Sequence, residues 1–90
     1  MSKLPERDDL VLALVGIWSA SLETKDIRRD SNFLELGGAS LEAVKIRAAI
    51  RGRFQRDVGL FEVIEHPTPQ ALADILPRSP VWIPDDYDVS

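Results

Sequence analysis

Ser40 is the residue of this chain whose setting best suits chemistry. It directly follows Gly37, Gly38 and Ala39, and an apolar pattern of helical spacing begins at the serine. Glycines leave the backbone bare, so an outside enzyme can approach the hydroxyl closely. The unpaired N–H groups at a helix N-terminus suit an attached or bound phosphate. Two interpretations are open: another enzyme modifies the serine, or Ser40 only caps a helix and the glycines only form a turn. Taken alone, the pattern favours the cap.

The residues needed for catalysis by the serine are missing. A nucleophilic hydrolase needs a base and an orienting acid, and the single histidine, His66, stands between a glutamate and a proline. The glycines do not match G-x-S-x-G, and no lysine follows them as in a P-loop. With no cysteine and one histidine, thiolate and His-rich metal sites are excluded. We therefore predict a protein that is not an enzyme and binds no metal.

The composition is that of an ordinary globular domain. The chain has 90 residues, of which 44% are apolar and 29% charged, and its net charge is -4. A chain of this size can bury only one thin core. Its negative charge argues against nucleic-acid binding. The longest apolar run, Leu10 to Trp18, is about half the length of a membrane span, so we expect no membrane contact, no signal peptide and a cytoplasmic location.

The first half of the chain predicts one helix and one long loop. Asp8 or Asp9 can cap the helix, and a packing reason is expected for Gly16 in its interior. The loop over residues 23–39 is polar and aperiodic, and it ends in the glycine pair. Its apolar anchors are expected to be Ile27, Phe33, Leu34 and Leu36. A long loop with such anchors is usually functional or closely packed on its domain.

The second predicted helix, from Ser40 to about Gln55, carries two apolar stripes. The core-facing stripe is expected to contain Ala43, Ile46, Ile50 and Phe54. The other stripe lies beside Ser40 and consists of Leu41, Val44 and Ala48, flanked by Lys45 and Arg51. It is either sandwiched between neighbouring helices or exposed as a recognition surface. We favour the recognition surface, because an apolar patch rimmed by charge marks an interaction site.

Two short helices follow. Leu60 to Ile64 form about one helical turn that Pro67 ends. Thr68 then caps a last helix that has Pro69 in its first position. The buried face of this helix is expected to contain Ala71, Leu72, Ile75 and Leu76.

Three stretches, taken together, are similar to a known family. They are IWSASL in the first helix, DSNFLELGGASLEAVKIRAAIRGRF across the loop and second helix, and LFEVIEHPTPQALADIL near the end. Over roughly residues 10–76 they resemble the peptidyl carrier proteins, or thiolation domains, of nonribosomal peptide synthesis. The resemblance implies an all-α, acyl carrier protein-like fold: a right-handed bundle of three main helices plus one short helix. It places the carrier domain at 8–76, after an extension at 1–7 and before a Pro-rich acidic tail at 77–90.

The resemblance also implies a cofactor and partners. In the family, the serine of Gly-Gly-x-Ser receives 4′-phosphopantetheine from coenzyme A through a magnesium-dependent phosphopantetheinyl transferase. The thiol of this arm then carries an aminoacyl or peptidyl thioester. By position the serine is Ser40, approached past Gly37, Gly38 and Ala39. The other implied partners are an adenylating enzyme and a downstream condensing, modifying or releasing enzyme. We expect a free-standing, monomeric carrier of natural product (antibiotic) biosynthesis.

Three positions depart from the family pattern. Ala39 stands where an aspartate or histidine usually precedes the serine, and Ser31 stands where an aspartate usually lies two residues before the phenylalanine. Both departures bear on which partners recognise the carrier. Arg47 replaces a commoner small or apolar residue, and we expect its guanidinium to snorkel past the edge of the core.

Charge distinguishes the carrier subtypes. From Ser40 to Arg56 the chain has one acidic and five basic residues, a local charge of +4. Carriers of fatty-acid synthesis typically present an acidic second helix to basic partners, which a basic helix would repel. The peptide type is therefore preferred. The basic helix also leaves open a rival function, a small helical module that binds a partner non-covalently through this helix.

The last stretch, PRSPVWIPDDYDVS, lies beyond the resemblance. Its prolines exclude a helix, Asp85, Asp86 and Asp88 make it acidic, and its large apolar side chains are unusual for a frayed linker. Two uses are open. The tail either folds back, with Trp82 covering part of the core and the aspartates facing the basic helix, or it docks on a partner enzyme. We favour folding back, because the charge of the tail opposes that of the helix.

Overall fold

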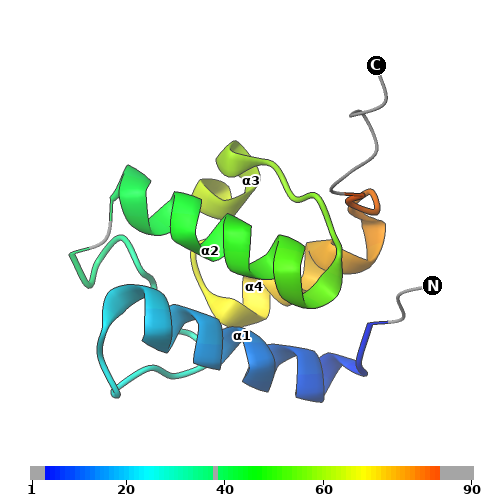
Figure 1. The fold of residues 1–90 in the computed structure, drawn as a ribbon. Helices are drawn as coiled ribbons and strands as arrows, with labels where there is room; N and C mark the ends of the chain where they lie inside the picture. Colours follow the sequence, from blue (N-terminus) through cyan, green and yellow to red (C-terminus); the bar gives the residue numbers. More distant parts are fainter. Residues whose placement is uncertain (1–3, 38, 84–90) are drawn as a thin grey trace.

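The computed structural model describes residues 4–37 and 39–83. Within this part of the chain the helices are α1 (Arg7–Leu22), α2 (Ser40–Phe54), α3 (Leu60–Glu65), α4 (Pro69–Ile75) and the 3-10 helix η1 (Leu76–Arg78). α1 packs on α2 and α4, α2 packs on α3, and α1 and α2 run in opposite directions (Figure 1). The predicted all-α bundle is confirmed, with α3 as its short helix.

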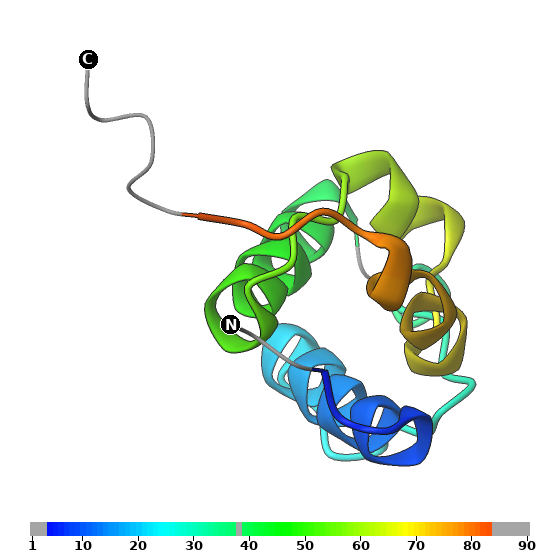
Figure 2. The same ribbon diagram turned by 90° about the vertical axis from the view of Figure 1, so that its right-hand side faces the viewer.

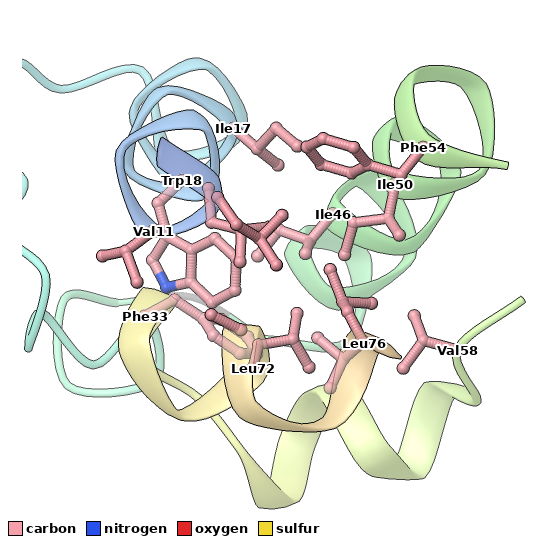
Figure 3. Packing of buried hydrophobic residues seen from close by; sticks show 14 of the residues in the cluster. Val11, Ile17, Trp18, Phe33, Ile46, Ile50, Phe54, Val58, Leu72 and Leu76 are labelled. Carbon is pink, nitrogen blue, oxygen red and sulfur yellow. The ribbon is translucent and has the colours of Figure 1, made fainter. Parts of the chain in front are cut away.

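The core lies between α1, α2 and α4, and it is closed by one side chain from each of two connections (Figure 3). The core-facing stripe predicted for α2 is buried. The buried face of α1 is wide. Its buried core residues are Leu10, Val11, Leu14, Ile17 and Trp18. Those of α2 are Ala43, Ile46, Ile50 and Phe54. The remaining core residues are Phe33, Val58, Val63, Leu72, Ala73 and Leu76.

Two details of α1 differ from the prediction. The helix begins at Arg7 with Glu6 as its N-cap residue, so neither Asp8 nor Asp9 caps it. Both aspartates instead lie in the first turn, where a negative charge interacts favourably with the helix dipole. The packing reason expected for Gly16 is also absent, because Gly16 is exposed and a Cβ built on it meets no atom within 4 Å.

The long loop is fastened to the bundle at the α3–α4 connection. The carbonyl of Pro67 accepts hydrogen bonds from the indole Nε1 of Trp18 at 2.9 Å and from the backbone N–H of Phe33 at 3.1 Å. The rings of Trp18 and Phe33 meet edge to face, with centroids 6.1 Å apart. Phe33 is therefore the main apolar anchor, and Ile27 packs partly against the core. The anchoring roles predicted for Leu34 and Leu36 are wrong, since both side chains are exposed.

The second half of the chain follows the predicted punctuation up to the end of α4, whereas the tail, predicted to have no helix, begins within the 3-10 helix η1. Thr68 caps α4 by accepting a hydrogen bond from the backbone N–H of Ala71 at 3.1 Å, and Pro69 opens the helix. At the far end of the bundle, Arg7 Nε donates to Asp74 Oδ1 at 2.8 Å and joins α1 to α4. This hydrogen bond holds the pKa of the Asp74 carboxyl below its ordinary value. No helix of the described chain has the length and apolarity needed to cross a bilayer.

After η1, residues 79–83 fold back along the α2–α3 connection, and we call this segment the strap (Figure 2). The backbone N–H of Asp57 donates to the carbonyl of Pro80 at 2.7 Å, and that of Trp82 donates to the carbonyl of Gln55 at 2.8 Å. These bonds flank an antiparallel bridge between Arg56 and Val81. The part of the tail up to Ile83 thus folds back. The predicted position of Asp85, Asp86 and Asp88 lies outside the described residues.

Candidate functional site

Ser40 is the first helical residue of α2, and its side chain is exposed. The N-cap position belongs to Ala39, which has no side-chain acceptor to offer the first turn. The Glu42 carboxylate closes only the other half of a capping box, by accepting from the Ala39 N–H at 2.8 Å. Ser40 is therefore not the N-cap residue that the capping interpretation requires. Within the described part of the chain, its hydroxyl makes no side-chain hydrogen bond.

The approach to Ser40 is bare backbone. Gly37 has a φ of +93°, a conformation that favours glycine, and a Cβ built there meets no atom within 4 Å. Before it, the Asn32 side-chain oxygen accepts from the backbone N–H groups of Leu34 at 2.8 Å and Glu35 at 3.3 Å, which folds the loop into a tight turn. Gly38 lies outside the described residues. The backbone conformation at position 37 thus favours glycine, the residue type predicted to keep the approach to the Ser40 hydroxyl open.

The stripe beside Ser40 is exposed. Leu41 retains 61% of its accessible surface and Val44 retains 45%, and Ala48 and Lys45 are exposed as well. In the same helix the core stripe is buried. This apolar stripe is therefore exposed and is not sandwiched between neighbouring helices. We refer to Leu41, Val44 and Ala48 as the outer stripe.

Arg51, predicted to flank this stripe, has internal partners at the opposite end of α2. Its Nη2 and Nε lie 2.8 and 3.1 Å from Asp57 Oδ1. Its guanidinium carbon also lies 5.3 Å from the centre of the Trp82 ring, a cation–π distance. Trp82, expected to cover part of the core, covers this guanidinium instead.

The other basic residues of α2, and Arg56 just after it, divide between the interior and the surface. Arg47 Nε donates to the carbonyl of Val58 at 3.3 Å from a partly buried position, which matches the predicted snorkelling. Arg56 donates to the carbonyl of Ser79 at 3.0 Å. Lys45 and Arg53 are exposed. Much of the basic charge that motivated the rival interaction module is thus used within the chain.

Phe61 is a surface residue that the sequence interpretation missed. It lies in α3 and retains 75% of its accessible surface, the largest fraction among the exposed large apolar residues of the described chain. The signal was present, because Leu60, Val63 and Ile64 share the side of a one-turn helix that faces the core and leave position 61 outside. No pocket and no cluster of three or more potential metal ligands occurs among the residues that the structure describes.

Comparison with known families and proteins identifies this arrangement. The family model described as "Phosphopantetheine attachment site" matches residues 13–76. The chain belongs to this family. It is 39% identical over 69 residues to malformin synthetase mlfA of Aspergillus niger, and 37% identical over 70 residues to phosphinothricin tripeptide synthetase PhsB of Streptomyces viridochromogenes. These matches cover 74% and 77% of this chain but only 1% and 6% of the synthetases.

A solved structure extends the likeness to three dimensions. The solution structure of the docking domain complex PaxA T1-CDD/PaxB NDD, from the Pax nonribosomal peptide synthetase, has a TM-score of 0.69 and 25% sequence identity. The match covers 88% of this chain and 72% of that one. The predictions of a non-catalytic peptidyl carrier domain and of covalently attached 4′-phosphopantetheine are confirmed. An exposed serine, at a helix start where the N-cap residue offers no side-chain acceptor, fits this cofactor.

Proposed function

We propose that Ser40 is the attachment residue and that the domain holds aminoacyl or peptidyl groups as thioesters during nonribosomal peptide synthesis. The observation that supports this most is the position of Ser40, exposed at the start of α2 and directly after the bare approach. Gly37, Gly38 and Ala39 keep that approach free of large side chains. When bound, the cofactor supplies a thiol at the end of a long arm.

The attachment step has a simple balance. The Ser40 Oγ–H is replaced by a phosphodiester bond to 4′-phosphopantetheine, and the pyrophosphate bond of coenzyme A breaks to release adenosine 3′,5′-bisphosphate. The hydroxyl proton passes to the transferase or to solvent. A partly positive helix N-terminus stabilises the negative charge of the phosphodiester. The first-turn N–H groups of α2 are available for this, because Ala39 offers no competing acceptor.

The proposed partners dock on the outer face of α2. A phosphopantetheinyl transferase attaches the arm, an adenylating enzyme loads it, and a condensing, modifying or releasing enzyme unloads it. The outer stripe supplies apolar contacts, the exposed Lys45 supplies a positive charge beside it, and Phe61 is a further apolar contact on α3. We propose that Arg51 serves this surface indirectly, by holding the strap. A monomer in the cytoplasm, where ATP and coenzyme A are at hand, suits these exchanges.

Intact-protein mass spectrometry tests the proposal. After incubation with coenzyme A, magnesium and a promiscuous transferase, the chain should gain the mass of one phosphopantetheine. Ser31 lies in the same tryptic peptide, 30–45, so Ser31→Ala is the matched control for Ser40→Ala. We expect full modification of the Ser31 variant and none of the Ser40 variant. Modification of the Ser40 variant would assign the arm to another residue. Co-expression with candidate adenylating enzymes then reports the cargo as a second mass increment.

A further inference from the structure

The strap follows the segment that the family model matches, which ends at residue 76. It is nevertheless well held. Backbone hydrogen bonds join it to Gln55 and Asp57, and Arg56 Nη1 donates to the carbonyl of Ser79 at 3.0 Å. The Trp82 ring contacts the Arg51 guanidinium, which is also hydrogen-bonded to Asp57. The carrier therefore has an ordered element after the segment that the family model matches.

The strap presents side chains in the alternation expected of extended backbone. Trp82 is half-buried against α2, whereas Val81 and Ile83 retain 56% and 59% of their accessible surface. Arg51 follows Ala48 by three residues, so the two are neighbours on the helix surface. Trp82 thus continues the outer stripe at its C-terminal end, and Val81 and Ile83 add exposed apolar groups beyond it.

An interface of ordinary size is large enough to include both Ser40 and the strap. With a rise of about 1.5 Å per residue, Arg51 lies about 16 Å along α2 from Ser40. A stable interface takes about 800 Å² from each partner, which corresponds to a patch about 30 Å across. An enzyme seated over the outer stripe and Ser40 therefore also contacts the strap.

We propose that the strap is a specificity element for the adenylating enzyme that charges this carrier, with Trp82 as its anchor. The inference rests on the proposed function. A promiscuous transferase accepts many carriers and so does not depend on side chains that differ between them. The adenylating enzyme must distinguish this carrier from others with the same bundle, and the strap is a place where they can differ. The enzyme should offer an apolar surface to Trp82 and Val81, with acidic side chains near Arg53 and Lys45.

Loading kinetics test the proposal on the full chain, with the adenylating enzyme identified by the mass assay, its amino acid and ATP. Trp82→Ala should raise the KM for the carrier about tenfold or more, as loss of a tryptophan anchor does, with little change in kcat. Trp82→Phe, which keeps a ring on Arg51, should restore most of the loss. Leu12→Ser is the matched control, since Leu12 is exposed to 63% on α1 and lies outside the proposed surface.

The outcomes separate the two proposals. A wild-type chain that gains no phosphopantetheine overturns the proposed function and the role of the strap with it. Normal attachment by the transferase, together with an unchanged KM in Trp82→Ala, overturns the role of the strap alone. A KM that rises equally in Leu12→Ser also overturns it, because the effect would then be one of general stability. Normal attachment with a raised KM only in the strap variants supports it.

Discussion

The two ends of α2 are built in opposite ways. At the N-terminal end, Ser40 stands exposed, and the N-cap residue Ala39 offers no side-chain acceptor to the first turn. At the C-terminal end, Arg51 is bonded to Asp57, covered by Trp82 and bordered by backbone bonds to the strap. The first end leaves room for a covalent arm, and the second has the Arg51 guanidinium paired within the chain. A single helix can therefore carry an open N-terminal end and a tightly bonded C-terminal end, because its buried core stripe holds it in the bundle.

The largest expected difference between the ends is in covalent modification. Ser40→Ala should abolish phosphopantetheine attachment completely, while unfolding free energy changes by no more than about 0.5 kcal/mol, the usual range for a surface substitution. Arg51→Ala should keep attachment and lose stability. Intact mass and thermal unfolding of both variants measure this. An Arg51 variant that cannot be modified would show that the two ends do not act separately.

The outer stripe and the core stripe of α2 should respond differently to the same substitution. Val44→Asp should leave the fold nearly intact and weaken transfer by partner enzymes about tenfold, as truncation of an interface residue can. Its neighbour Ala43 is fully buried, so Ala43→Asp should unfold the domain by burying an unpaired charge. Circular dichroism and loading rates compare the pair. An unfolded Val44 variant would mean that the outer stripe contributes to the core.

Removing the strap tests how much it stabilises the domain at the C-terminal end of α2. Truncation after Arg78 should cost about 1–2 kcal/mol, since several backbone hydrogen bonds and a cation–π contact are lost. For a domain of this size, each kcal/mol lowers the melting temperature by about 4–8 °C. Truncation after Ile83 is the control, because it leaves the strap in place. Equal melting temperatures for the two truncated chains would show that the strap does not contribute to the stability of the folded domain.

Matched glycine substitutions compare the backbone at the two ends. Gly52 lies in the last turns of α2 without a positive φ, and a Cβ added there would meet no atom within 4 Å. Gly52→Ala should therefore stabilise the domain by about 0.5–1 kcal/mol. Gly37→Ala should destabilise it by about 1–2 kcal/mol, because φ is +93° there. Denaturant unfolding measures both changes. The same sign at both positions would contradict the assigned backbone conformations.

The smallest effect is the coupling between Arg51 and Trp82. A double-mutant cycle with Arg51→Ala and Trp82→Ala should give a coupling free energy of about 0.5–1 kcal/mol, the value of a partly exposed cation–π pair. The Arg53→Ala and Trp82→Ala cycle serves as the reference, since Arg53 lies over Phe54 instead. Equal coupling in both cycles would indicate a non-specific charge effect.

The sequence predicted what depends on periodicity and local punctuation. The core stripe of α2, the Thr68 cap and the turn of α3 follow from spacing and from proline, and the structure has all of them. The position of Ser40 at the start of α2 was predictable as well, because glycines before a serine at a helix start form a local pattern. The exposure of the outer stripe was one of two open interpretations, since spacing alone does not tell which helices cover a second face.

What the sequence did not predict depends on contacts between distant residues. Pro67 receives bonds from Trp18 and Phe33, so Leu34 and Leu36 are not needed as anchors, and no local pattern signals this. The engagement of Arg51 with Trp82 likewise joins positions 31 residues apart in the chain. Gly16 remains without a structural explanation.

The two tryptophans lie in contrasting surroundings, and this gives the protein a pair of intrinsic optical reporters. Trp18 is fully buried against Phe33 with its indole N–H bonded to Pro67, so its emission should be blue-shifted and protected from iodide until the bundle unfolds. Trp82 is half-exposed beside a cationic side chain, so iodide should quench it in the folded state. Release of the strap, arrival of a partner and loss of the core can therefore be followed separately by fluorescence in one unlabelled sample.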